Sequence, residues 1–271
     1  MSGNAEEPDA RHGVEERIVG SDRVLAVLAE LGQHPDGITL DELATTLSSP
    51  KPTVHRALAS LRRAGFADQI GRGRYLLGDE YLRLAFQNYD GRSETARIEP
   101  VLKELAERIG ETAHYAVLDC KHVVYRSKVD PLQGAVRLTS TIGGRNPAYS
   151  TAVGKLLLGF ILNSHAELTQ WIGSDALERR TPNTCIDSEA LWEQIRKSHE
   201  LLYATDDQEN EIGVNCVAVP LYQNRSAVPS GAVSISGLEF RRPLAELVEL
   251  LPVIRSTIES HLGPGSALAV Q

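Results

Sequence analysis

The sequence predicts an α+β fold in two parts: a small helical N-terminal domain, and a larger C-terminal domain with a mostly antiparallel sheet flanked by helices. First, the length of 271 residues exceeds one typical domain of about 100–200 residues. Second, three short amphipathic helices lie near the N-terminus, and strand-like and helix-like segments alternate irregularly after residue 93. Third, 42% hydrophobic and 24% charged residues are typical of a soluble globular chain and exclude collagen-like and wholly disordered classes.

Three helices are predicted within residues 20–78, after residues 1–19, which carry few large apolar side chains and are expected to form a flexible tail. Apolar residues at the i, i+3, i+4, i+7 spacing of a helix face mark them: Val24, Val27, Leu28 and Leu31; Leu40, Leu43, Ala44 and Leu47; Val54, Ala57, Leu58 and Leu61. Thr39 and Glu42 have capping-box spacing at the second helix, and Ser48-Ser49-Pro50 offers an N-cap for the third.

A β-hairpin with a basic tip follows the third helix, because residues 66–70 and 74–77 flank Gly71-Arg72-Gly73. A helix, a helix-turn-helix and a hairpin in this order predict a winged helix-turn-helix, whose recognition helix enters the DNA major groove. Residues 51–75 hold six basic residues and one acidic residue, although the whole chain has a net charge of -8. This basic segment is the candidate for contact with the phosphates of a double-stranded DNA operator.

The third helix carries polar residues on the face opposite its apolar side. Arg56 is the candidate for reading a base edge, with Thr53, His55 and Ser60 beside it. The other basic residues are candidates for phosphate contacts, which give affinity without sequence information. The predicted DNA-binding set is Lys51, Thr53, His55, Arg56, Ser60, Arg62, Arg63, Arg72 and Arg74. An ordinary solvated basic surface is the alternative, and the surrounding helices and hairpin favour DNA.

Residues 79–92 are predicted to form a linker helix, whose apolar residues Tyr81, Leu82, Ala85, Phe86 and Tyr89 would pair two chains. Residues 93–271 are predicted to form the larger domain, opening with a helix through Ile98, Leu102, Leu105 and Ile109. Expected strands lie near residues 115–118, 123–126, 136–138, 216–221 and 232–236. Expected helices lie near residues 152–161, 165–171, 189–198 and 244–254, the last kinked or restarted near Pro252.

Motifs of enzymes and metal sites fail in this sequence. Gly154-Lys155 resembles the end of a phosphate-binding loop, but Tyr149 and Leu156 replace its glycine and its hydroxyl residue. His114, Cys120 and His122 could be imagined as zinc ligands, but no fourth ligand stands at a recognisable spacing. We therefore expect no enzyme activity, no cofactor and no metal. No long apolar run or signal peptide is present, which predicts a cytoplasmic protein without a membrane segment.

Three segments of the chain resemble the IclR family of bacterial transcriptional regulators: PKPTVHR (residues 50–56), IGGRNPAYSTAVGK (residues 142–155) and EIGVNCVAVP (residues 211–220). The resemblance runs from about residue 20 to the C-terminus. It implies a winged-helix DNA-binding domain, a dimerising helical linker, and a C-terminal domain that binds a small organic acid and contacts other subunits. Members usually act as homodimers or homotetramers, and as repressors or activators.

The resemblance also implies an effector site. By matching positions, the carboxylate of the effector would meet the backbone amides of Ala152 and Val153, and Asp206, Cys216, Ser234 and Ser236 would complete a polar end. Leu138 and Asn146 would line the wall. Ser234 and Ser236 also alternate on a predicted strand and so share a face, although two such serines could equally face solvent.

The leading hypothesis is a DNA-binding regulator of a catabolic operon that responds to a small carboxylic acid, aromatic or sugar-derived. The alternative is a metabolite-binding protein or an enzyme with a vestigial DNA-binding domain. DNA affinity that falls steeply with salt would favour the regulator, whereas turnover or ligand binding without operator preference would favour the alternative.

Overall fold

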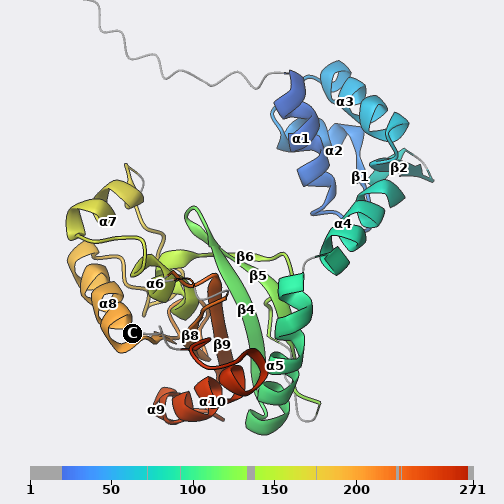
Figure 1. The fold of residues 1–271 in the computed structure, drawn as a ribbon. Coiled ribbons are helices and arrows are strands. Elements are labelled where there is room, and N and C mark those ends of the chain that lie inside the picture. The colour runs from blue at the N-terminus through green and yellow to red at the C-terminus, as the bar shows by residue number, and fades with distance from the viewer. Residues whose placement is uncertain are drawn as a thin grey trace, which may run out of the picture. The chain divides into compact units, whose positions relative to one another are not determined.

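The computed structural model of the chain describes residues 20–267 except residues 72, 92, 133–137, 175, 224, 225 and 227. The predicted N-terminal tail, residues 1–19, lies outside the described residues. The chain forms two compact units, Met1–Gly91 and Arg92–Gln271 (Figure 1). No helix in the described part of the chain is long and apolar enough to cross a bilayer.

The first unit is a winged helix-turn-helix. Helices α1 (Gly20–Leu31), α2 (Leu40–Thr46) and α3 (Lys51–Arg63) confirm the three predicted helices. Strands β2 (Ala67–Ile70) and β3 (Arg74–Leu77) form the predicted hairpin, and β1 (Ile38–Thr39), too short to predict from its pattern, pairs with β3. The apolar faces of the three helices meet in a core that includes the fully buried side chains of Val27, Leu43, Val54 and Leu58.

The two predicted helix caps have different outcomes. The capping box of α2 is confirmed, since Thr39 Oγ1 accepts from the amide of Glu42 at 3.3 Å and Glu42 Oε2 accepts from the amide of Thr39 at 2.8 Å. The predicted serine cap of α3 is wrong, because Pro50 occupies the N-cap position without a side-chain hydrogen bond. The hydroxyl of Ser49 instead donates to the carbonyl of Leu47 at 2.9 Å. The serine thus closes the turn between the helices and leaves the start of α3 uncapped.

Helix α4 (Asp79–Gly91) ends the first unit, and α5 (Ser93–Ile109) begins the second. The sheet of the second unit has six antiparallel strands in the order β6-β5-β4-β9-β8-β7. Their bounds are β4 Thr112–Asp119, β5 His122–Val129, β6 Arg145–Pro147, β7 Ala204–Asp207, β8 Val214–Leu221 and β9 Gly231–Leu238. Of the predicted strand 136–138, residues 136 and 137 lie outside the described residues, and Leu138 is not in a strand, so this prediction is not supported.

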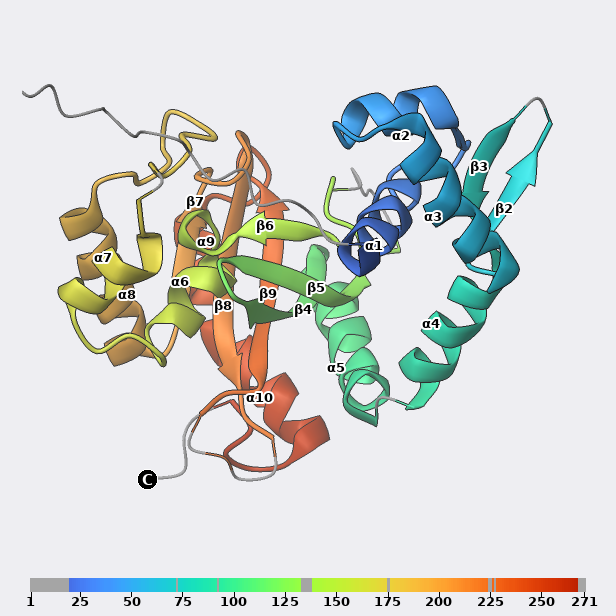
Figure 2. The same cartoon turned by 90° about the horizontal axis from the view of Figure 1, so that it is seen from above.

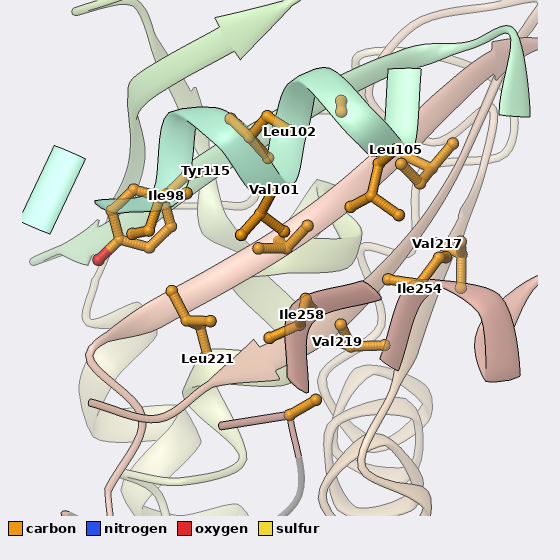
Figure 3. Packing of buried hydrophobic residues seen from close by; sticks show 14 of the residues in the cluster. Ile98, Val101, Leu102, Leu105, Tyr115, Val217, Val219, Leu221, Ile254 and Ile258 are labelled. Atoms are coloured by element: carbon orange, nitrogen blue, oxygen red, sulfur yellow. The ribbon is translucent and has the colours of Figure 1, made fainter. Parts of the chain in front are cut away.

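Helices cover both faces of this sheet. One face packs against α5 and against α9 (Leu244–Glu249) and α10 (Leu251–Leu262), which restart around Pro252 as predicted. Figure 3 shows this core, where Leu102 and Leu105 of α5 lie with Val217 of β8 and Ile254 of α10. The other face packs against α6 (Ala152–Leu158), α7 (His165–Ile172) and α8 (Ser188–Leu201), as seen on the far side of the sheet from α5 in Figure 2. Helix α6 ends three residues before its predicted end.

Small side chains let α6 lie close to the sheet. Ala116, Ala218 and Ala232 are completely or almost completely buried beneath it, on three adjacent strands. Gly154 within α6 approaches the short helix Ala148–Ser150 so closely that a Cβ atom there would lie 2.1 Å from the carbonyl oxygen of Ala148. Further along the same face of these strands, polar residues replace the alanines. The candidate site lies where these polar residues begin.

Candidate functional site

The recognition helix α3 presents one polar face. Because Val54, Leu58 and Leu61 are buried in the core, Thr53, Arg56, Ser60 and Arg63 follow one another along a different face at helical spacing. Thr53 and Ser60 are half-buried, whereas Arg56 and the neighbouring His55 are exposed. Neither Arg56 nor His55 makes a hydrogen bond or ion pair with another described residue. Arg56 is therefore free to reach an external partner.

Four of the other predicted DNA-binding residues, Lys51, Arg62, Arg63 and Arg74, use their basic groups to bind partners inside the protein. Lys51 Nζ lies 2.9 Å from the carboxylate of Asp41, Arg62 donates to Gln69 at 3.0 Å, and Arg63 donates to Ser60 at 3.2 Å. These contacts are exposed and contribute little stability, so DNA phosphates can replace them. Arg74 differs, because its guanidinium donates to the carbonyls of Asp36 and Gly37 and so ties the hairpin to the turn before β1. Arg72 lies outside the described residues.

A pocket in the second unit brings together all eight residues of the predicted effector site. It has a volume of about 480 Å³ including the open space at its mouth. The eight are Leu138, Asn146, Ala152, Val153, Asp206, Cys216, Ser234 and Ser236. Eight further lining residues were not predicted: His114, Tyr125, Thr139, Ser140, Thr151, Asn210, Glu211 and Val214. His114 is in register with Ser234 on the neighbouring strand and so shares its face, a relation that is visible only once the strands are paired.

The floor of the pocket is a polar row across the sheet. Asp206 of β7, Cys216 of β8 and Ser236 of β9 are directly opposite one another in the strand register. The sulfur of Cys216 lies 3.0 Å from the hydroxyl oxygen of Ser236. Burial raises the pKa of the Cys216 thiol far above its ordinary value, and the carboxylate of Asp206 raises it further. The thiol is therefore protonated at neutral pH and is no nucleophile.

Asp206 is a buried carboxyl group whose side chain is poised between two protonation states. Only 2% of the residue is exposed. Its Oδ1 accepts from the backbone amides of Glu209 at 2.7 Å and Asn210 at 3.3 Å. Burial raises the pKa of Asp206 to about 7, although the charge of Lys155 and these two hydrogen bonds act in the opposite direction. The protonated form of Asp206 is therefore accessible near neutral pH, unlike that of an ordinary aspartate.

The start of α6 forms the wall of the pocket with free backbone donors. The hydroxyl oxygen of Thr151 caps the helix by accepting from the amide of Gly154 at 3.0 Å. Within the described residues, the amides of Ala152 and Val153 donate to no acceptor.

Thr139 donates to Glu211 at 2.6 Å and so links the segments before β6 and before β8 beside the pocket.

A buried ion pair holds the segment after β7 against α6. Lys155 of α6 and Glu209 are paired, and their side chains are 3% and 8% exposed. Lys155 also donates to Gln194 of α8 at 2.9 Å. The backbone amide of Glu209 donates a hydrogen bond to Asp206 Oδ1. The ion pair therefore helps to fix the carboxyl group of Asp206 at the pocket floor.

The residues imagined as zinc ligands are not gathered by the fold. His114 lies in the pocket, whereas Cys120 and His122 are exposed at the turn between β4 and β5. Among the described residues, no three or more His, Cys, Asp and Glu side chains are placed to hold a metal ion.

Comparison with known proteins gives two matching family models. Residues 21–71 match the IclR helix-turn-helix domain, and residues 93–260 match the model described as bacterial transcriptional regulator IclR C-terminal. The HTH-type transcriptional regulator KdgR of Escherichia coli (strain K12) is 32% identical over 247 residues, which cover 89% of this chain and 91% of KdgR. The HTH-type transcriptional regulator XynR of the same strain is 31% identical over 231 residues, covering 85% of this chain and 90% of XynR.

A solved structure is similar to part of the chain. It is a double mutant of the inducer-binding domain of the PobR transcription factor from Acinetobacter, in complex with 3-hydroxybenzoic acid. It is 26% identical with a TM-score of 0.55, and the match covers 61% of this chain and 95% of that one.

Proposed function

The chain belongs to the IclR family of bacterial transcriptional regulators, and from this we propose that a small organic acid bound in the pocket of the second unit changes its affinity for an operator. The protein is a DNA-binding transcriptional regulator, as its relatives are. The effector is a carboxylic acid, aromatic or sugar-derived, and the regulated genes form a catabolic operon. The observation that carries this proposal is the gathering of eight residues, from segments far apart in the sequence, around one pocket.

The pocket is rich in groups that can donate hydrogen bonds to a carboxylate. The amides of Ala152 and Val153 are unpaired, and they lie at the positive end of the α6 dipole. The hydroxyls of Ser234 and Ser236 and the protonated form of Asp206 add three more donors. The inducer-binding domain of PobR was solved in complex with 3-hydroxybenzoic acid, which supports a small aromatic acid as the effector.

The DNA-binding unit is proposed to act in pairs. Tyr81, Leu82 and Phe86 on α4 are 41%, 46% and 65% exposed, and apolar side chains grouped in this way on a surface mark interaction sites. Pairing two chains along α4 would place two recognition helices on a pseudo-palindromic operator. Ala85 belongs to the same predicted stripe, and the side chain of Tyr89 lies outside the described part of the molecule.

The test uses the full-length protein and DNA from upstream of its own gene. Electrophoretic mobility shifts are measured with a panel of aromatic, keto and sugar acids, and acid binding is measured by calorimetry. At least one acid should change the operator affinity, and the paired variants Ser234→Ala and Ser236→Ala together should weaken its binding at least about tenfold, the loss expected for two hydrogen bonds to a charged group. Normal binding of the acid by this folded double variant would overturn the pocket assignment.

A further inference from the structure

His114 is a pocket residue that the family resemblance did not assign. It lies on β4, in register with Ser234 on β9, and only 2% of it is exposed. Its Nε2 is 2.8 Å from the hydroxyl oxygen of Ser140. Its Nδ1 is completely buried and has no hydrogen-bond partner, and it is the only such side-chain atom among the described residues that line the pocket.

Two polar side chains near His114, those of Lys128 and Tyr125, are already paired with other groups. Lys128 donates to the backbone carbonyls of Leu138 at 3.0 Å and Ser140 at 2.8 Å, and its Nζ lies 3.3 Å from Asp130. Asn146 donates to the hydroxyl oxygen of Tyr125 at 3.2 Å. Buried polar atoms in native proteins are nearly always paired, so an unpaired nitrogen on a residue that lines the pocket is a position where a bound ligand can supply the missing partner.

The chemistry of that group follows from the state of the imidazole. Burial lowers the pKa of His114 to about 3, and the charge of Lys128 lowers it as well, so the ring is neutral at physiological pH. A neutral ring provides no ionic attraction for a second carboxylate. Its free nitrogen is a donor in one tautomer and an acceptor in the other, and a hydroxyl group can pair with either.

We propose that His114 Nδ1 recognises a hydroxyl group of the effector, which makes the effector a hydroxy acid. The inference rests on the proposed function, since the carboxylate of the same molecule would occupy the donors at the start of α6. The ring of Tyr125, whose centroid is 5.0 Å from that of His114, adds an aromatic surface beside the hydroxyl. Aromatic and sugar-derived acids both carry hydroxyl groups, so the experiment has one arm for each.

Calorimetry on the full-length protein compares acids that differ in their hydroxyl groups. Benzoate is compared with 3-hydroxybenzoate and 4-hydroxybenzoate, and hexanoate is compared with gluconate. In at least one arm the hydroxylated acid should bind at least about tenfold more tightly than the acid without a hydroxyl group. This is the discrimination expected when the second acid leaves His114 Nδ1 unpaired. The arm that responds identifies the aromatic or the sugar-derived source.

The variant His114→Phe should reduce the ratio of the two dissociation constants, with and without the hydroxyl group, to about twofold or less. It should do so chiefly by weakening the binding of the hydroxylated acid. The matched control is His165→Phe, which removes a histidine that also contacts a serine, Ser188 at 3.1 Å, but lies outside the pocket lining. The control should keep the ratio of the unsubstituted protein. If His114→Phe does not fold, the imidazole ¹⁵N signals of His114 in the unsubstituted protein give the second readout, and they should shift with the hydroxylated acid only.

Equal affinity for the paired acids in both arms, or a ratio retained in folded His114→Phe, would overturn the role of His114. If a non-hydroxylated acid binds and changes operator affinity, the carboxylate pocket stands while the hydroxy-acid inference fails. If no acid of either kind binds or changes operator affinity, both proposals fail.

Discussion

The protonation of Asp206 should make the proposed effector binding dependent on pH. With a pKa of about 7, the side chain gains a negative charge as the pH rises, whereas an ordinary carboxylic acid is ionised throughout this range. Two negative charges in one buried site repel each other. If binding requires protonated Asp206, affinity for the acid should fall by about tenfold between pH 6 and pH 8. Calorimetry at several pH values checks this, and Asp206→Asn should remove the dependence.

Arg56 should decide operator preference. Arg56→Ala is expected to cost about 1–3 kcal/mol of binding free energy at the preferred operator and to relax the preference at one or two base pairs. Arg62→Ala on the same helix is the control, and it should weaken all DNA sequences alike. Binding titrations on a set of operator variants make the measurement. An unchanged preference in folded Arg56→Ala would show that another residue reads the bases.

At the residue level, the family resemblance was enough to predict eight of the pocket residues. It was not enough to predict the partners of Arg74, because the carbonyls of Asp36 and Gly37 come close to it only when β1 pairs with β3. His114 and Tyr125 were missed for a similar reason. The family resemblance assigned neither of them to the site, and strand register, which the sequence does not specify, brings them to the pocket.

At the element level, helix α6 depends on the absence of a side chain at Gly154. Gly154→Ala would place a methyl group against the backbone of Ala148 and force the two segments apart. We expect a loss of about 1–3 kcal/mol in the free energy of unfolding, the range typical of overpacking, with weaker acid binding as the start of α6 moves. Gly20→Ala is the matched control, since a Cβ atom there has open space. Denaturant unfolding of both variants gives the comparison.

Helix α4 should hold two chains together through its apolar stripe. The double variant Leu82→Glu with Phe86→Glu puts charges where two helices would pack, and it should convert a dimer to a monomer at micromolar concentration. Gln87→Glu adds a charge to the same helix without removing an apolar side chain, and it should leave the assembly unchanged. Light scattering distinguishes the two masses. A monomer in the unsubstituted protein would contradict pairing altogether.

The helices were easier to predict than the short strands for a physical reason. A helix of three turns repeats its apolar spacing several times, as α1 and α3 do. Strands β1, β6 and β7 contain two to four residues, which is too few for an alternating pattern to stand out. They become strands because β3, β5 and β8 offer them a free edge, and such pairing is decided only when the sheet assembles.

For the whole molecule, the proposal is that occupation of the pocket and binding of the operator are coupled. A ligand shifts a conformational equilibrium only through its different affinity for the two states, and thermodynamic linkage makes this coupling reciprocal. Typical couplings of about 1–3 kcal/mol correspond to factors of roughly 5–150 in affinity. An acid that releases the protein from DNA must therefore bind the DNA-bound protein more weakly by the same factor.

Calorimetric titration of the acid into the full-length protein, with and without saturating operator, measures this coupling directly. The ratio of the two dissociation constants should equal the factor by which saturating acid changes operator affinity, and both effects should weaken together in the Ser234→Ala and Ser236→Ala double variant. An acid that binds the pocket with the same affinity in both states would contradict regulation through this site.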